Sequence, residues 1–236
     1  MRELIDLHTH TVSSGHAYST VKENIDSARD KGIKYLGISD HAPKMPGTAH
    51  IYHFHNLRVI PKHIDGVNVF VGAEVNILDF DGNVDLTDDD LNNLDYAIAS
   101  FHPPCINPGT EEENTRAVIN VMKKPNIKII GHLDDSRYPV NYEEVVIAAK
   151  ENNILLELNN SSLRPNGFRV GALENDKKML EFCRKHKAKI IFGSDSHICY
   201  DIGKFDNCIN LVNEINFPKE LIINYNEEEI KGIFNI

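Results

Sequence analysis

Seven short runs rich in apolar and β-branched residues recur along the chain, and segments of helical composition separate them. The runs end near His8, Asp40, Glu74, His102, His132, Asn159 and Asp195, so that successive ends lie 27 to 36 residues apart. That spacing is typical of βα units, and nearly continuous apolar strands indicate a parallel sheet buried on both faces. The pattern predicts a single α/β domain over residues 1–236, closed into a TIM-like barrel of seven β/α units.

Helix signals occupy several of the intervening segments. Thr20 and Glu23 form a capping-box pattern at the start of "VKENIDSARDKG", and Gly32 is placed to end that helix. "YEEVVIAAKENN" (142–153) and "NDKKMLEFCRKHK" (175–187) carry apolar residues at helical spacing. We expect a helix in each segment.

Six of the seven runs end in Asp, Glu or His, and a barrel gathers the C-terminal ends of its strands at one face. The pattern therefore predicts a common pocket for His8, His10, His41, Glu74, His102, His132, Asp195 and His197. His8 and His10 lie two residues apart, so both imidazoles point to the same side of an extended strand and can chelate one ion. Imidazoles and carboxylates together suit zinc, with iron or manganese as alternatives.

The simpler interpretation is that these histidines make structural hydrogen bonds. With 12 histidines in the chain, about 0.6 H-x-H pairs are expected by chance. A second pair, His53 and His55, follows no strand-like run, and we expect surface or supporting roles for it. For a single run-end histidine the structural interpretation would be favoured. Eight ligand-type residues at one topological position favour a metal site instead.

Composition excludes several functional classes. The formal net charge of −10 disfavours extended contact with a nucleic-acid backbone, so we do not expect a nucleic-acid partner. No apolar run approaches the roughly 20 residues of a membrane helix, and the first residues lack the apolar core of a secretory signal. We therefore expect a cytoplasmic protein without a membrane partner, whose four cysteines are free thiols.

The ordered segments "DLHTHTVSSGHAYST", "ISDHAP", "GAEVNI", "ASFHPP", "IIGHL", "LELNNSS" and "FGSDSH" resemble the motifs of the PHP (polymerase and histidinol phosphatase) superfamily. The resemblance is to its small stand-alone, YcdX-type phosphatases and extends over roughly residues 4 to 225. It implies a distorted (β/α)7 barrel that holds three divalent ions, usually zinc, and hydrolyses phosphate esters.

The resemblance also implies a ligand set. A first ion would be held by His8, His10, Glu74 and Asp195, a second by Glu74, His102 and His132 with Glu74 bridging, and a third by His16, His41 and His197. Glu74, Asp195 and His197 would be the catalytic residues in their role as parts of the metal site.

Three divalent ions against the two carboxylates would leave about four positive charges, enough to attract a phosphate dianion despite the acidic surface. A water bridging two ions would become the nucleophile, and the third ion would bind phosphoryl oxygens. The expected activity is that of a phosphatase, a phosphoric ester hydrolase of the EC 3.1.3 type, acting on small phosphomonoesters.

Supporting roles are predicted for several further residues. Asp6 and Asp40 could accept the second N–H of ligand imidazoles. Arg58, Arg137, Arg164 and Arg169 are candidates for binding phosphate bidentately, and Arg164, in "NNSSLRP", and Arg137 are preferred among them. After His132 the chain reads "LDDSRYP", where related sequences commonly have a proline and glycine turn. The loops 41–57 and 161–171 are expected to set specificity.

Two other functions remain open from the sequence. An amidohydrolase-like enzyme that cleaves a C–N bond would also use strand-end histidines on a barrel, because one fold hosts several chemistries. A non-catalytic, metal-binding regulatory domain would keep its ions for stability only. The loss of ligand residues would mark that second alternative, and none is missing here.

Overall fold

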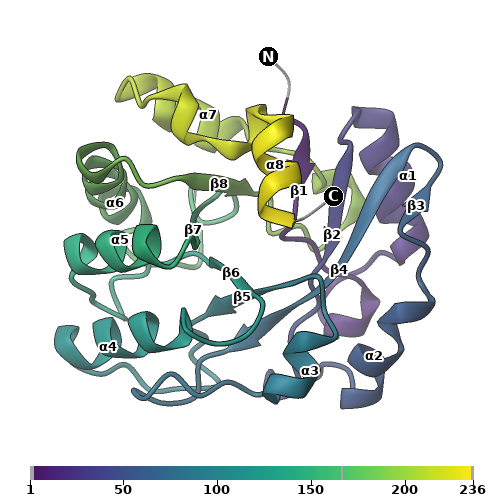
Figure 1. Ribbon diagram of the computed structural model, residues 1–236, viewed down its shortest axis with the longest axis horizontal. Coiled ribbons are helices and arrows are strands. Elements are labelled where there is room, and N and C mark those ends of the chain that lie inside the picture. Colours follow the sequence, from purple (N-terminus) through teal and green to yellow (C-terminus); the bar gives the residue numbers. More distant parts are fainter. Residues whose placement is uncertain (1–2, 166, 235–236) are drawn as a thin grey trace.

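The computed structural model describes residues 3–165 and 167–234, and their seven parallel strands form a nearly closed barrel (Figure 1). The strands follow the order β1-β2-β4-β5-β6-β7-β8, and a short β3 pairs antiparallel with β4. The strands are β1 (Ile5–Asp6), β2 (Tyr35–Ile38), β3 (His63–Ile64), β4 (Val67–Asn76), β5 (Tyr96–Ser100), β6 (Ile127–Ile130), β7 (Leu155–Asn159) and β8 (Ile190–Gly193). Each of the seven apolar runs contains one of the parallel strands, which confirms the predicted barrel.

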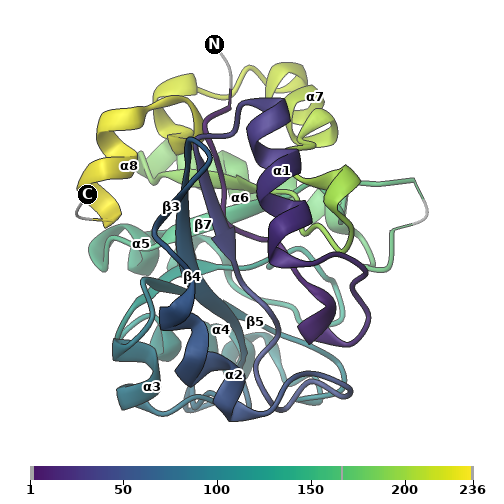
Figure 2. The same ribbon diagram turned by 90° about the vertical axis from the view of Figure 1, so that its right-hand side faces the viewer.

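Eight helices accompany the strands in the described ranges. They are α1 (Val21–Lys31), α2 (Ile51–Asn56), α3 (Asp88–Asn92), α4 (Glu111–Val121), α5 (Tyr142–Glu151), α6 (Ala172–His186), α7 (Asp206–Glu214) and α8 (Glu227–Phe234). Helices α4, α5 and α6 follow one another along one side of the barrel (Figure 1), and α1 packs on β2 at another side (Figure 2). No helix in the described part of the chain is long and apolar enough to cross a membrane.

The caps of α1 agree with the sequence pattern. Thr20 and Glu23 form the predicted capping box, and Gly32 ends the helix in the left-handed region at φ 67°. Helix α6 begins three residues before the predicted start, at Ala172, behind Gly171, which also has a positive φ. The hairpin between β3 and β4 was not predicted, although Asp65 and Gly66 provide the two positive φ angles that a two-residue turn requires.

Two apolar clusters hold the barrel together. The smaller takes buried side chains from all seven parallel strands, including Ile5, Phe70, Tyr96 and Ile191, together with Ile230 of α8. Because side chains from every strand can meet only inside the barrel, this cluster fills its interior. The larger cluster lies between the strands and the surrounding helices.

Side chains and loop backbone close the seam between β1 and β8. Asn224 donates from Nδ2 to the carbonyls of Ile5 (3.0 Å) and Phe192 (3.1 Å) and accepts from the Phe192 amide (2.7 Å). Nearer the strand ends, the backbone of Thr9 pairs in parallel with that of Ser196. The seam therefore depends on a fully buried asparagine that substitutes for backbone partners.

We predict that Asn224→Asp lowers the free energy of unfolding by about 3 kcal/mol, because a carboxylate cannot donate to the two carbonyls and leaves them buried without partners. The matched control is Asn213→Ala on α7, where the asparagine is exposed. Denaturant unfolding of both variants measures the difference. Equal stability of the two variants would show that the seam does not need the side chain.

Candidate metal centre

The structure brings together all nine residues of the expected ligand set. His8 and His10 follow β1, His41 follows β2, Glu74 lies in β4, His102 follows β5, His132 follows β6, Asp195 and His197 follow β8, and His16 follows the short 3-10 helix Val12–Ser14. Most of them are fully buried, whereas His197 is partly exposed and His16 is exposed. The ends of the strands thus meet at one face, as the run ends predict.

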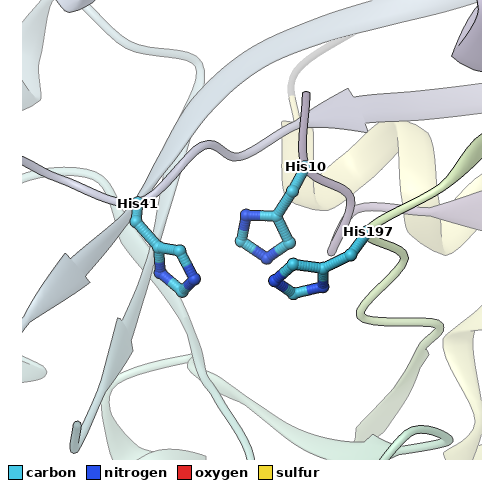
Figure 3. A group of neighbouring side chains, drawn as sticks. All are labelled: His10, His41 and His197. Carbon is cyan, nitrogen blue, oxygen red and sulfur yellow. The ribbon is translucent and has the colours of Figure 1, made fainter. Parts of the chain in front are cut away.

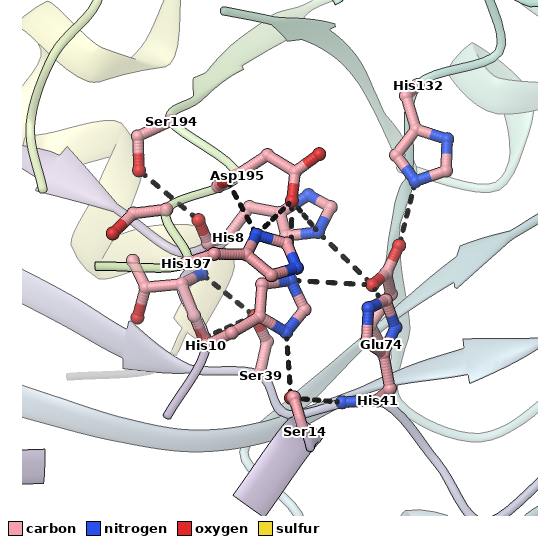
Figure 4. Close-up of polar contacts among 12 residues, drawn as sticks. His8, His10, Ser14, Ser39, His41, Glu74, His132, Ser194, Asp195 and His197 are labelled. Carbon is pink, nitrogen blue, oxygen red and sulfur yellow. Dashed lines mark hydrogen bonds and ion pairs between the residues drawn. The ribbon is translucent and has the colours of Figure 1, made fainter. Parts of the chain in front are cut away.

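The carboxylate of Glu74 lies between the rings of His132 and His41 (Figure 4). Its Oε1 lies 2.8 Å from Nε2 of His132 and 3.1 Å from Nε2 of His102. Its Oε2 lies 2.7 Å from Nδ1 of His41 and 3.4 Å from Nε2 of His8. One carboxylate therefore faces imidazoles that come from several different strand ends.

Asp195 forms a second centre. Its Oδ1 lies 3.4 Å from Nε2 of His10 and 3.5 Å from Nδ1 of His197. His10, His41 and His197 point toward one another (Figure 3), each with a ring nitrogen within 4.8 Å of those of the other two. The ring of His16 stacks on those of His41 and His197, at centroid distances of 5.0 and 4.8 Å.

Three imidazoles are anchored through Nδ1. The Nδ1–H of His8 donates to Glu157 (2.6 Å), that of His10 to Ser14 Oγ (3.1 Å), and that of His102 to Asn76 Oδ1 (2.7 Å). In each ring Nε2 is buried and makes no hydrogen bond. An unpartnered buried nitrogen costs about 1–3 kcal/mol. Several of them directed into one space fit divalent ions, because neutral imidazole binds a metal through the nitrogen that its anchor leaves free.

The electrostatics favour the protonation states of ligands. Burial alone would raise the pKa of Glu74, but the imidazoles of His102, His41 and His8 hold that pKa well below its usual range. Burial, together with the neighbouring His41 imidazole, lowers the pKa of His10 to about 3, and burial lowers the pKa of His102 to about 4. Ionised carboxylates and neutral imidazoles are the forms that bind divalent metals.

His8 differs from these imidazoles. Burial lowers its pKa, yet the carboxylates of Glu157, Glu74 and Asp195 outweigh burial and raise the pKa well above the usual range. The three carboxylates therefore favour a positive charge at this ring. A metal ion on Nε2 would supply it in place of the proton.

Two ligand positions have an uncommon backbone conformation. His132 and Asp195 both have positive φ angles, of 25° and 51°. The left-handed region costs a non-glycine residue of the order of 1 kcal/mol or more and is concentrated at functional sites. The surrounding barrel holds both residues in these turns, which place their side chains at the strand ends.

Glu157 is a supporting residue that the sequence alone did not reveal. Besides His8, its carboxylate accepts from the amide of His132 (2.8 Å) and from Nδ2 of Asn159 (3.0 Å). A Cβ at Gly193 would collide with Oε1 of Glu157, so a glycine on the neighbouring strand provides the room. The central position of Glu157 in the apolar run "ILLELNN" was the available signal.

The structure gives Asp6 and Asp40 roles that differ from those predicted. Asp6 accepts from the amides of Ser194 (3.2 Å) and Gly203 (2.8 Å), so it joins β1 to the segment after β8. Asp40 accepts from Ser14 Oγ (2.7 Å), and that hydroxyl in turn receives the Nδ1–H of His10. Asp40 thus supports a ligand imidazole through a serine, and Asp6 supports the barrel.

The arginines are also arranged differently from the prediction. Arg164 pairs with Asp201 (2.8 Å) and does not line the pocket above the imidazoles. Arg137 donates from Nε to both carboxylate oxygens of Asp135. Arg169 lines the pocket, and its NH2 lies 3.2 Å from Oδ2 of Asp195. The two preferred arginines are therefore each paired with another carboxylate, and Arg169, a further candidate, is the cation inside the site.

Two histidines of the loop 41–57 lie outside the cluster. His53 approaches Asp40 from α2, with 3.3 Å between Nε2 and Oδ2. His55 is exposed and pairs with Asp90 (2.8 Å). Both fit the surface and supporting roles expected for this second H-x-H pair.

A parallel (β/α) barrel with imidazoles and carboxylates gathered at the C-terminal ends of its strands defines the class of metal-binding barrel proteins. Within that class the chain belongs to the PHP domain family, whose match covers residues 6–234.

Relatives of known name support this assignment. Proteins named "probable phosphatase" from Clostridium novyi and Clostridium acetobutylicum are each 49% identical over 230 residues, which cover 98% of this chain and 93% of theirs. The histidinol phosphate phosphatase of Lactococcus lactis, solved with zinc, L-histidinol and phosphate, shares the fold at a TM-score of 0.63 and 16% identity, over 92% of this chain and 95% of its own. A chain of an archaeal ribonuclease P with mature tRNA also shares the fold, at a TM-score of 0.58 and 13% identity, over 98% of this chain and 90% of its own.

We predict that Glu157→Gln weakens Zn²⁺ binding by about 10- to 100-fold, because the amide keeps only one acceptor for the three donors around it and no longer holds the His8 ring firmly. Competition with a chromophoric chelator measures the affinity. Glu181→Gln, at an exposed position on α6, is the matched control. Unchanged Zn²⁺ affinity in a folded Glu157→Gln variant would contradict the supporting role.

Proposed function

We propose that the chain is a metal-dependent phosphatase that hydrolyses small phosphomonoesters in a site holding three divalent ions, with zinc as the principal metal. Membership of the PHP domain family and the names of the close relatives support the activity. The zinc and phosphate bound by the Lactococcus lactis enzyme, which has the same fold, support the metal and the substrate class. Iron or manganese could replace zinc at sites of this ligand type.

One observation carries the proposal: the unpartnered Nε2 atoms of His8, His10 and His102 converge on the carboxylates of Glu74 and Asp195. We assign the ligands in the three groups that the family resemblance implies. They are His8, His10, Glu74 and Asp195; Glu74, His102 and His132; and His16, His41 and His197. In the structure, ligand atoms of His10, of His41 and of His197 also lie within 4.8 Å of one another, so His10 adjoins the third group. The contacts of Glu74 with His8, His41, His102 and His132 also place His41 beside the second group, so the three groups form one continuous cluster.

Divalent ions in such a cluster act as Lewis acids and acidify bound water, which removes the need for a nucleophilic side chain. The protein supplies the imidazoles, two ionised carboxylates and a pocket of about 220 Å³ above them. The partly exposed His197 and the buried His41, His102 and Asp195 line this pocket. A small ester would therefore enter with its phosphoryl group toward the cluster.

Arg169 provides the second recognition element. Its guanidinium donates to Ser162 Oγ (2.9 Å) and to Asp195, and it lies in the wall of the pocket. Guanidinium groups bind phosphoryl oxygens bidentately and keep their charge at every working pH. We assign to Arg169 the orientation of the phosphoryl group, a role for which Arg164 and Arg137 were the preferred candidates from the sequence.

The alternatives lack a comparable observation. A C–N hydrolase would share the barrel, but the family and the relatives point to phosphate esters. A regulatory domain that only binds metal would not need a guanidinium group beside its metal ligands. Arg169 is such a group, since its NH2 lies 3.2 Å from Oδ2 of Asp195. An assay that compares phosphate esters with cyclic amides distinguishes a phosphatase from a C–N hydrolase. Measurable turnover of any of these substrates excludes a domain that only binds metal.

We predict that the purified chain loaded with Zn²⁺ binds about three ions and releases phosphate from small esters, that a strong chelator abolishes release, and that added Zn²⁺ restores it. Glu74→Gln should lose bound metal and turnover together, because this carboxylate contacts the largest number of ligand imidazoles. Elemental analysis and phosphate release are measured on the same samples, with Glu181→Gln as the control. Full activity after complete removal of metal would contradict the proposal.

We predict that Arg169→Met raises KM for phosphomonoesters by about 10- to 100-fold, the effect of losing charge-assisted hydrogen bonds worth about 1.5–3 kcal/mol. Arg164→Met is the matched control, because that arginine lies on the same loop and pairs with Asp201 outside the pocket. Steady-state kinetics of both variants are compared at equal metal content. Equal KM values would remove Arg169 from substrate binding.

A further inference from the structure

The wall of the pocket beyond the imidazoles is largely apolar. Phe101, Pro103 and Pro104 come from the segment after β5, Met45 from the loop after β2, and Phe168 from the loop after β7. The volume of about 220 Å³ lies below the roughly 300–1,000 Å³ of pockets that enclose larger ligands. A small organic group attached to the phosphate would therefore contact these apolar side chains.

Phe168 is the most exposed side chain of this wall. It is 73% exposed, so it forgoes much of the roughly 1.5–3 kcal/mol that burial of a phenylalanine provides. It is also the residue before Arg169, which reaches the ligand carboxylate Asp195. An exposed aromatic ring next to the phosphate-binding arginine indicates a surface that a ligand covers.

The ring of Phe168 is held in place. The guanidinium of Arg137 lies 4.3 Å from the ring centroid, and its Nε lies 3.0 and 2.9 Å from the two carboxylate oxygens of Asp135. The Ser136 amide donates to the carbonyl of Val170 (2.8 Å), which ties the loop to the segment after β6. Arg137 therefore covers one side of the ring, and the ring is fixed before any ligand arrives.

The carboxylates in the wall of the pocket already have cationic partners. Asp135 is occupied by Arg137, and Asp195 belongs to the ligand cluster and contacts Arg169. These two are the carboxylates among the residues that line the pocket. Neither is left to pair with an ammonium group on the substrate, so the wall favours a neutral group.

From these contacts we propose that the site selects phosphomonoesters whose alcohol part carries a neutral, planar ring, and that Phe168 stacks on this ring. The proposal rests on the phosphatase function proposed above. Arg169 and the imidazole cluster receive the phosphoryl group, while Phe168, one residue away, receives the ring. Stacking of a planar ring on an aromatic side chain contributes about 0.5–1.5 kcal/mol beyond the burial of apolar area.

The test compares four esters of primary alcohols, so that leaving-group reactivity is similar: benzyl, cyclohexylmethyl and ethyl phosphate, and phosphoethanolamine. With the Zn²⁺-loaded enzyme, kcat/KM for benzyl phosphate should exceed that for ethyl phosphate by about 10-fold, and should also exceed that for the non-planar cyclohexylmethyl ester. Phosphoethanolamine should be no better than ethyl phosphate. Inhibition by benzylphosphonate, compared with ethylphosphonate, reports the same preference as binding without turnover.

Phe168→Ala should remove the preference for benzyl phosphate, mainly through KM, and lower kcat/KM for ethyl phosphate much less than kcat/KM for benzyl phosphate. Phe168→Tyr should keep the preference. Tyr200→Ala is the matched control, because this tyrosine is 72% exposed and lies outside the pocket lining. Sedimentation of each variant shows whether Phe168 instead contacts a second copy of the chain.

The outcomes separate this inference from the proposed function. Hydrolysis of none of the four esters by metal-loaded enzyme would overturn the phosphatase proposal. Hydrolysis of all four with no preference for the planar ring, a faster reaction with phosphoethanolamine, or a preference that survives in Phe168→Ala would overturn the inference and leave the phosphatase proposal intact. A change in sedimentation without a change in preference would likewise overturn it.

Discussion

The contact of one buried carboxylate with imidazoles from several strand ends is the constraint on which the rest of the structure depends. Glu74 has no exposure and faces His8, His41, His102 and His132 at 2.7 to 3.4 Å. Polar groups concentrated in this way are costly to bury unless each finds a partner. These polar groups stay together only if the strands that carry them are joined to one another. The polar contacts across the seam between β1 and β8 serve this purpose. Asn224 closes that seam within the barrel, and Asp6 closes it near the ends that carry the ligands.

The residues that accept hydrogen bonds from the imidazoles determine which nitrogen of each ring is left free to bind a metal. Three different acceptors, a carboxylate, a hydroxyl and an amide oxygen, take the Nδ1–H groups of His8, His10 and His102. Because each anchor fixes both tautomer and orientation, the free Nε2 atoms are directed inward before a metal arrives. Glu157 contributes most among these acceptors. It accepts from the His8 ring and also from the backbone amide of His132 at the end of β6. Preorganisation of this kind reduces the cost of ordering a site when its ligand binds.

The architecture and the centre of the site could be predicted from the sequence because both depend on periodicity. The apolar runs give the strands, and the residue at the end of each run must lie at one face of a parallel barrel. His16 lies in a loop after β1, outside that pattern, and only the family resemblance suggested it. Glu157 and Asn224 could not be assigned, because their partners are 149 and 219 residues away and no local rule places them together. Arg169 was one of four candidate arginines, but its contact with Asp195, 26 residues away, could not be told from the sequence. The hairpin at Asp65 and Gly66 is different, since its turn signal is local and was readable in the sequence.

The loops explain why chemistry and specificity are separable in this fold. Strand ends carry the imidazoles, and their positions are fixed by the ladder of parallel pairs and by the interior core. The segment 161–171 carries Arg169 and Phe168, and it is attached through Asp135 and Val170 to the segment after β6. A change in that loop can therefore alter what the pocket admits without moving a strand end. The segment after His132 carries Asp135 and Arg137, and the guanidinium of Arg137 lies against the ring of Phe168. Two loops, one after β6 and one after β7, therefore build this side of the pocket wall.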